Sequence, residues 1–516
     1  MKQIIIRLCL PLCLLAAGCS TTRNASQKDN GKITINFLQV NDVYEIEPIE
    51  AGKTGGMARV ATLKKELLKT NPNSYLLMAG DFLSPSVYNS LTYEGKRIRG
   101  RQMVEAMDAA GMDFAVFGNH EFDINEAELQ SRINESKFTW IASNSFHKTD
   151  AGLVPFAKTK AQGAVPFPET YIMHVKDADG TTAKIGFIGI NIPFNKASYV
   201  SYTDPLLTAE KLYTQIKDSC DAVIAFTHQL MQDDILLAKK LPGLAAILGG
   251  HEHDMRYQQV GNVMVAKAHS NARSAYIVAL SINKKTGRHK VSAKLKMIDA
   301  SIALDSATNA TVKKWSDIAE KNYASLGFDA KDIVMQKGEP LEARESIIRR
   351  TTTNFSKLII NAMEQAAPDA QVAIVNSGSI RLDDVLQAPV TQYDIIRTLP
   401  FGGSIVEVDM KGSLLKAVLE AGRKNAGIGG FLHYSADVFY DAINQQWTFK
   451  KAPIMQDAIY RVALSDFLLT GGEANLNFLN KDNPQILKIY PVATSAKDLK
   501  YDIRLAIIAY MEKLKM

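Results

Sequence analysis

Short apolar runs alternate with segments of helical periodicity along most of the chain. Residues 33–40 alternate apolar and polar positions, which predicts a strand. Residues 57–69 place Val60, Leu63 and Leu67 at helical spacing, which predicts an amphipathic helix. The pattern continues with a helix predicted over 102–110 and strands predicted over 75–78, 114–117, 184–190, 222–226 and 245–248. This alternation predicts a layered α/β domain.

The pattern changes toward the middle of the chain. Residues 255–300 are richer in strand-like alternation, with strands predicted over 263–267 and 275–282. Residues 311–335 have the pattern of a connecting helix, and a further α/β or α+β unit follows. We therefore expect a first domain over 33–300, a linker helix within 301–335 and a second domain over 336–516.

Composition agrees with a folded multidomain protein. The chain has 516 residues, which is too long for one compact core, and 46% of them are hydrophobic. A net charge of +6 is small for this length and does not indicate a partner that is a nucleic acid polymer. Beyond the N-terminus, no segment reaches the ~18 consecutive apolar residues of a membrane span.

The N-terminus has the pattern of an export signal. Residues 1–18 combine Lys2 and Arg7 with an apolar stretch and small residues, as a secretory signal does. Residues 15–19 (LAAGC) resemble the lipobox of bacterial lipoproteins, in which the cysteine becomes the lipidated first residue. Residues 19–32 suit a flexible tether. We expect a protein of the bacterial cell envelope that is anchored through a lipid on Cys19. A membrane anchor helix and an ordinary cleaved signal are the alternatives.

Five apolar runs each lead into potential metal ligands. These ligands are Asp42, Asp81, Asn119, His228, His251 and His253. Strand ends of a layered α/β domain converge at one edge, where ligands bind. Oxygen and imidazole donors suit Mn, Fe, Zn or Ni, and two ions that share one Asp can clamp both oxygens of a phosphoryl transfer. One such Asp alone is usually a turn residue, so the prediction rests on the five runs occurring together.

These motifs resemble the metallophosphoesterase superfamily and, within it, the 5′-nucleotidase family. The markers are Asn41-Asp42, GGMAR over 55–59, Gly80-Asp81, GNHEFD over 118–123, Thr227-His228 and GHEH over 250–253. The resemblance implies a four-layer αββα catalytic domain followed by a second α/β domain that binds substrate.

The resemblance also implies a role for each side chain. One divalent transition-metal ion, such as Zn, Mn or Fe, would be held by Asp42, Asp81 and His253. A second ion would be held by Asp81, Asn119, His228 and His251, so that Asp81 bridges the two. His120 would stabilise charge on the phosphate, and Asp123 would orient its imidazole. Water or hydroxide on the metals would attack phosphorus in line.

The first motif departs from the family pattern. The family has Asp-x-His, whereas residues 42–44 of this chain read Asp-Val-Tyr. Because a phenol has a pKa of about 10, Tyr44 could bind metal only as a phenolate beside a strongly acidic ion such as ferric iron. We expect a non-ligating Tyr44 beside a weaker or differently loaded first site, with the phenolate ligand as the alternative.

The second domain has motifs of the family's substrate-binding half. They include NSGSIR over 376–381 and GGFL over 429–432, and they imply substrate contacts from Arg349, Asn376, Arg381 and Phe431. Members with a nucleoside clamp read Gly-Gly-Asp-Gly before an aromatic residue, whereas residues 471–476 read GGEANL, with Phe478 nearby. Each stacking face contributes about 1–3 kcal/mol, so a missing ring weakens the case for nucleotide specificity.

Together these features predict a hydrolase. We expect it to cleave 5′-nucleotides or related phosphomonoesters outside the cytoplasm, as a monomer whose only attachment is its lipid anchor. One alternative is a hydrolase of a nucleotide sugar, cyclic nucleotide, sugar phosphate or sulfur ester on the same scaffold. The other is a binding lipoprotein without turnover. His120 paired with Asp123 argues against the binding protein, because binding alone needs no such pair.

Overall fold

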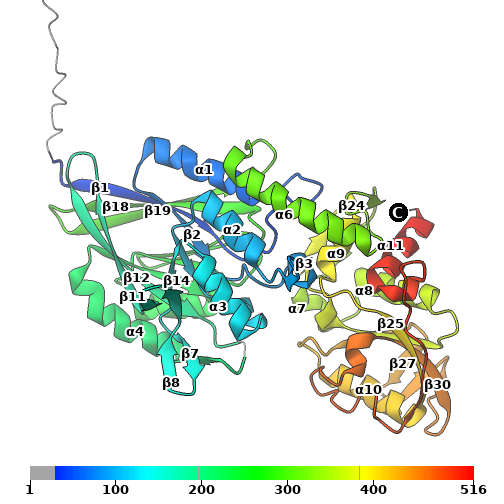
Figure 1. The fold of residues 1–516 in the computed structure, drawn as a ribbon. Helices are drawn as coiled ribbons and strands as arrows, with labels where there is room; N and C mark the ends of the chain where they lie inside the picture. Colours follow the sequence, from blue (N-terminus) through cyan, green and yellow to red (C-terminus); the bar gives the residue numbers. More distant parts are fainter. Residues whose placement is uncertain (1–28, 195–196, 383, 516) are drawn as a thin grey trace, which may run out of the picture.

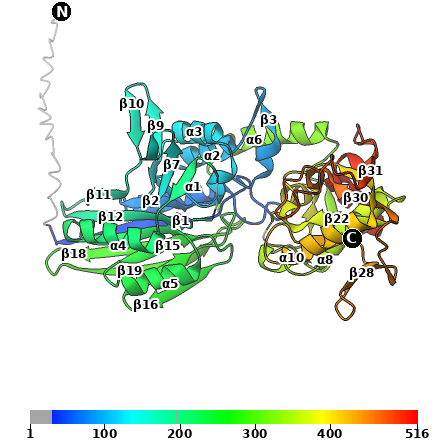
Figure 2. The same cartoon turned by 90° about the horizontal axis from the view of Figure 1, so that it is seen from below.

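The computed structural model describes residues 29–194, 197–382 and 384–515, which form two α/β domains (Figure 1 and Figure 2). The signal predicted over 1–18, Cys19 and most of the predicted tether lie outside the described residues. Among the helices of the described ranges, none has the length and apolar character needed to cross a bilayer.

Two six-stranded sheets stack face to face in the first domain. Their orders are β19-β18-β1-β2-β5-β6 and β11-β12-β14-β15-β17-β16. The first sheet consists of β1 (Lys32–Val40), β2 (Ser74–Ala79), β5 (Phe114–Val116), β6 (Thr139–Ile141), β18 (Ser274–Asn283) and β19 (Arg288–Met297). The second consists of β11 (Thr170–Lys176), β12 (Thr182–Asn191), β14 (Ala222–His228), β15 (Ala246–Gly250), β16 (Arg256–Val260) and β17 (Val263–Lys267). Phe37, Phe187 and Phe226 belong to the apolar core between the sheets.

Helices cover the outer face of each sheet and complete the predicted four-layer αββα arrangement (Figure 1). The helices are α1 (Met57–Thr70), α2 (Arg101–Ala110) and α3 (Glu126–Glu135) on one side and α4 (Pro205–Ile216) and α5 (Met231–Lys240) on the other. In each sheet the central strands run parallel, so their carboxyl ends share one edge. Such strands are buried on both faces, which explains the nearly continuous apolar runs in the sequence.

The linker is shorter than the sequence predicts. Helix α6 (Ser306–Ser325) replaces the helix expected over 311–335, so the prediction is wrong for the last ten residues. The helix ends because Gly327 adopts a φ of 91°, a left-handed conformation that stops helices. The short strand β20 (Ile333–Met335) then pairs with β24 (Val390–Thr391) of the second domain. Trp315 of α6 is fully buried against the first domain.

The second domain is built on a five-stranded sheet of order β26-β22-β30-β25-β31. Its strands are β22 (Val372–Asn376), β25 (Ile405–Lys411), β26 (Leu432–Tyr434), β30 (Ile459–Ser465) and β31 (Ile486–Ile489). Helix α10 (Gly412–Lys424) packs on one face, and α8 (Asn354–Ala366) and α11 (Ile503–Leu514) pack on the other. The short helix α9 (Gln392–Thr398) faces the first domain through Tyr393. The expected α/β character of this domain is confirmed.

Candidate metal centre and active site

The expected ligands lie together at one edge of the sandwich. Asp42, Asp81 and Asn119 follow β1, β2 and β5 of the first sheet, whereas His228 ends β14 and His251 follows β15 of the second. Ligand atoms of Asp81, His228 and His251 all lie within 4.8 Å of one another. The remaining ligands are close by: Nδ1 of His251 is 3.1 Å from Oδ1 of Asn119, and Nε2 of His253 is 3.7 Å from Oδ1 of Asp42.

Left-handed backbone turns bring these ligands inward. Asp42, Asp81 and His251 have φ values of 52°, 56° and 91°, so the chain reverses sharply after each strand. The close approach of the strands also requires glycine. A Cβ on Gly80 would lie 2.6 Å from Nδ1 of His228, and one on Gly250 would lie 2.3 Å from the carbonyl oxygen of Ala79.

The orientation of His228 fits a metal ligand. Its Nδ1 lies 2.7 Å from the carbonyl oxygen of Ala79, which can only accept, so Nδ1 donates and Nε2 faces Oδ2 of Asp81 at 3.1 Å. Within the described ranges, Nε2 of His228 and Oδ1 of Asp42 are buried without a hydrogen-bond partner of good geometry. Buried polar atoms of this kind need an explanation, and a divalent cation between them supplies one. The donor set therefore fits the expected metals.

The charged groups of this cluster strongly shift one another's pKa values. Burial favours neutral imidazole, but Asp81 and Asp42 raise the pKa of His228 to about 10. Burial would raise the pKa of Asp81, but His228 and His120 lower it well below its ordinary value. A cation bound here would displace a proton from His228, so metal affinity should rise with pH.

His120 lies beside the ligand cluster and is held from two sides. Its Nδ1 is 2.6 Å from Oδ2 of Asp123, and its backbone N–H donates to Oδ1 of Asp81 at 2.8 Å. Arg381 of the second domain approaches the same imidazole, with Nη2 at 3.3 Å from Nδ1. Burial lowers the pKa of His120, but Asp123 and Asp81 outweigh it and raise the pKa to about 9. Both carboxylates therefore favour the cationic form of the imidazole.

Tyr44 points into the same site. Its hydroxyl lies 3.0 Å from Nε2 of His253 and 3.4 Å from Oδ2 of Asp81, and its side chain is buried. His253 and Asp81 are two of the three residues expected to hold the first ion. The hydroxyl therefore lies between two expected ligands of the first ion, and its role stays a prediction.

The other expected substrate contacts belong to the second domain. Arg349 donates to Oε1 of Glu345, and Nη1 of Arg381 lies 4.0 Å from the same oxygen. Asn376 is buried and donates to Oε2 of Glu473 at 2.6 Å. Phe431 is half-buried, with its ring edge-on to His433 at 5.4 Å.

Leucine stands at the clamp position in the segment after Glu473. Leu476 is fully buried, and Phe478 is half-buried and packs against the apolar cluster beneath α10.

Sequence reasoning missed two supporting residues. Glu121 accepts hydrogen bonds from the backbone nitrogens of Gly118, Asp81, Phe82 and Leu83, which fixes the loops after β2 and β5. Burial and the nearby Asp81 raise the pKa of Glu121 to about 7. Its only sequence signal was its place within the GNHEFD block.

Lys267 supports the loops from the second sheet. This fully buried lysine donates to Oε2 of Glu252 at 2.6 Å and to the carbonyl oxygen of Gln229 at 2.5 Å, and it lies 2.9 Å from Oδ2 of Asp234. Glu252 separates the ligands His251 and His253. A lysine at the end of an apolar strand was the available signal for this cluster.

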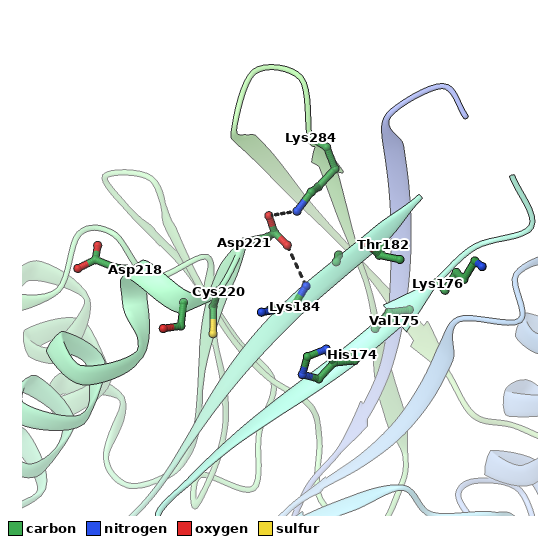
Figure 3. A pocket seen from close by; sticks show the side chains of 11 residues that line it. His174, Val175, Lys176, Thr182, Lys184, Asp218, Cys220, Asp221 and Lys284 are labelled. Carbon is green, nitrogen blue, oxygen red and sulfur yellow. Dashed lines mark hydrogen bonds and ion pairs between the residues drawn. The ribbon is translucent and has the colours of Figure 1, made fainter. Parts of the chain in front are cut away.

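Two cavities lie at opposite ends of the first domain. One, of about 470 Å³, opens between the domains beside the metal ligands and is lined by His251, His253, Arg344 and Asp384 among others. The other, of about 480 Å³, lies at the opposite edge of the second sheet, where Asp221 binds Lys284 and the backbone of Lys184 (Figure 3). Only the first cavity adjoins the predicted ligands.

A cluster of oxygen and imidazole ligands at the strand ends of an αββα sandwich defines a metal-dependent phosphoesterase. Residues 35–255 match the family of calcineurin-like phosphoesterases, and residues 334–480 match the 5′-nucleotidase C-terminal domain. The chain therefore belongs to the calcineurin-like phosphoesterases that carry a 5′-nucleotidase C-terminal domain, which are hydrolases.

Known proteins resemble the chain along most of its length. The 5′-nucleotidase of Rattus norvegicus is 25% identical over 473 residues, covering 81% of this chain and 78% of the relative. The structure of a 5′-nucleotidase precursor from Thermus thermophilus has a TM-score of 0.67 at 20% identity and covers 94% of this chain and 97% of its own. The Thermus thermophilus sulfate thiohydrolase SoxB has a TM-score of 0.63 at 14% identity, with coverages of 93% and 94%. These two structures show a shared fold.

Proposed function

We propose that the protein hydrolyses 5′-nucleotides or related phosphomonoesters with two divalent metal ions. The observation that carries this proposal is the convergence of ligands from two sheets on the buried carboxylate of Asp81. Asp42, Asp81 and His253 would hold one ion, and Asp81, Asn119, His228 and His251 would hold the other. When bound, such ions supply Lewis-acid activation of water and neutralise charge on the phosphoryl oxygens.

The chain's own residues would bind and polarise the substrate. Asp123 holds Nδ1 of His120, so Nε2 of the cationic ring is free to donate to a phosphoryl oxygen or to the leaving oxygen. The guanidinium of Arg381 lies beside His120 and adds a planar donor from the second domain. Because these groups come from different domains, a bound phosphoester would be enclosed between them.

A second candidate substrate class follows from the surroundings of Phe431. Phe431 has no aromatic partner from residues 471–478, so a base would gain at most one stacking face there. Sugar phosphates and other phosphoesters without a nucleobase do not need a stacking ring, so its absence does not weaken their binding. Phosphate release from a panel that contains both classes decides between them: a strong preference for nucleotides favours the first.

Metal content and rate together test the proposed roles. Asp81→Ala should remove bound metal and activity, because one carboxylate serves both ions. His120→Ala should keep the metal and lose about 10²–10⁴-fold in rate. His174→Ala is the control, since His174 is exposed and lines the cavity at the far end of the second sheet. If His120→Ala loses metal as fully as Asp81→Ala, then His120 is a ligand and the assignment is wrong.

We further propose that a lipid on Cys19 anchors the protein in the bacterial cell envelope, which rests on the LAAGC sequence over 15–19. Metabolic labelling with radioactive palmitate should mark the full chain, and Cys19→Ser should remove the label. Equal labelling of both chains would refute the anchor.

A further inference from the structure

Three neighbouring strands of the first domain present a basic outer face. Val278 and Leu280 of β18 and Val291 and Leu295 of β19 face the core between the sheets, so the alternate residues point outward. The cationic members of the outward set are Lys32, Arg288, Lys290, Lys294 and Lys296. The other outward residues of β1, β18 and β19 are neutral, and Leu38, Val40 and Ala275 among them are buried beneath the helices, so the exposed part of the face lies along β19 and at the start of β1. We refer to this surface as the β1–β18–β19 face.

The cations of this face are not neutralised within the described part of the chain. Exposed lysines elsewhere form ion pairs, as Lys313 does with Asp317 and Lys331 with Glu320. By contrast, among the described residues no carboxylate lies within 4.0 Å of a charged nitrogen of the five cations. Lys284, at the adjoining turn, is different because it pairs with Asp221 at 2.5 Å (Figure 3).

One end of the face lies where the described chain begins. Lys32 is the first residue of β1, and β18 and β19 lie beside it in Figure 1. Arg288 lies level with Lys32 at this end, whereas Lys296 pairs with Ala275, next to the Tyr276 that faces Gln39, so the face extends to the carboxyl end of β1. Asp29 and Asp179 lie at the Lys32 end of the sandwich and are engaged by Thr181, and Asp299, two residues after β19, interacts electrostatically with Lys296 without forming an ion pair. None of the five cations lines the interdomain cavity, so contact through them would not engage its lining residues.

The spacing of the cations suits an extended anionic plane. Lys290 and Lys294 are four residues apart on one strand, about 13 Å, which is too far for both to grip one phosphate group. Pairing of β19 with a second copy of the chain would bring lysines of two chains together, which like charges oppose. A layer of lipid headgroups avoids both the distance between the lysines and the repulsion of like charges, because each cation can bind a separate phosphate group.

We propose that the β1–β18–β19 face docks on the anionic headgroups of a lipid bilayer. This contact is separate from the proposed hydrolysis and from acylation of Cys19. Each Lys or Arg near an anionic membrane strengthens binding by about fivefold. Removing three of the five charges should therefore weaken binding on the order of 100-fold at low salt, and salt should weaken the parent's binding through screening.

Sedimentation with vesicles tests the proposal directly. The full chain carrying Cys19→Ser, which has no acylation site, is mixed with phosphatidylcholine vesicles that contain or lack phosphatidylglycerol. Arg288→Gln/Lys290→Gln/Lys294→Gln should lose binding to the anionic vesicles. The matched control alters exposed lysines of the second domain: Lys337→Gln/Lys451→Gln/Lys481→Gln. The control should bind as the parent does, and both triple variants should keep the parent's phosphate release.

Three results would overturn the proposal. Equal vesicle binding by the two triple variants would show that only net charge matters. Equal binding of the parent to neutral and anionic vesicles would show that headgroup charge does not matter. Self-association of the first triple variant with unchanged vesicle binding would show that the lysines merely protect the edge strand β19 from pairing. Circular dichroism of each variant verifies that the fold is retained.

Discussion

Glu45 offers a measurable link between pH and stability. Its carboxylate is 4% exposed and accepts a hydrogen bond from the hydroxyl of Tyr393, across the domain boundary. The nearest cation, Arg397, is already paired with Asp394 at 2.9 Å. Burial therefore raises the pKa of Glu45 from 4.5 to about 8, with the neighbouring carboxylate of Glu47 adding to the shift. Glu45→Gln keeps the shape of the side chain and removes the ionisation.

The sign of the expected effect follows from proton linkage. Between pH 4.5 and about 8 the folded protein holds a proton on Glu45 that the unfolded chain releases. The contribution of Glu45 to stability is thus fully present below pH 4.5 and is lost as the pH rises toward 8. The loss is about 1.4 kcal/mol per pH unit within this window. From pH 5.5 to 7.5, Glu45→Gln should therefore gain about 2.7 kcal/mol relative to the parent.

Urea denaturation followed by tryptophan fluorescence at several pH values measures this difference. The titration of all other groups is shared by the two proteins, so it cancels when their free energies of unfolding are subtracted. Glu66→Gln, at an exposed position on α1, is the control and should differ from the parent by the same amount at every pH. A difference for Glu45→Gln that does not grow with pH would refute the reasoning.

Three further substitutions probe the site. Lys267→Met should lower the free energy of unfolding by about 3–5 kcal/mol, because it leaves buried carboxylates unpaired, and unchanged denaturation would refute this. Tyr44→Phe should leave metal content and rate nearly unchanged if Tyr44 does not bind metal; a coloured iron protein that bleaches on this change would instead identify a phenolate ligand. Phe431→Ala should weaken nucleotide binding by about 1–3 kcal/mol but spare small phosphoesters, and an equal loss for both would exclude stacking.

Much of the first domain was predictable because its periodicity is simple. Parallel strands buried on both faces give apolar runs, and the turn after each run must expose a polar residue at the shared edge. Asp42, Asp81 and His228 could therefore be placed from the sequence, and the structure brings them together. The end of the linker helix was harder to predict, because residues 326–335 continue the helical pattern while Gly327 ends the helix through its backbone conformation.

Other features depend on contacts between distant segments. Arg381 meets His120 across 261 positions of sequence, which requires the relative placement of two domains. Glu121 binds four backbone nitrogens, and backbone donors leave no mark in the sequence. The buried ion pair of Lys267 likewise needs the fold before its partners are known. Sequence pattern therefore located the ligands but not the groups that hold them.

The substitution of tyrosine for histidine lies in a segment with three attachments. Tyr44 reaches the metal ligands through His253, Glu45 reaches the second domain through Tyr393, and Glu47 reaches the linker helix through Ser316. These three residues lie within four consecutive positions, so they cannot move independently. A displacement of the second domain that breaks the Glu45 contact would act on the loop that carries Tyr44. Glu45→Gln can keep the hydrogen bond to Tyr393 while it removes the charge. This substitution should therefore change how the free energy of unfolding depends on pH and leave the metal content unaltered. The two measurements together separate the effect of the charge of Glu45 from the effect of its contact with the second domain.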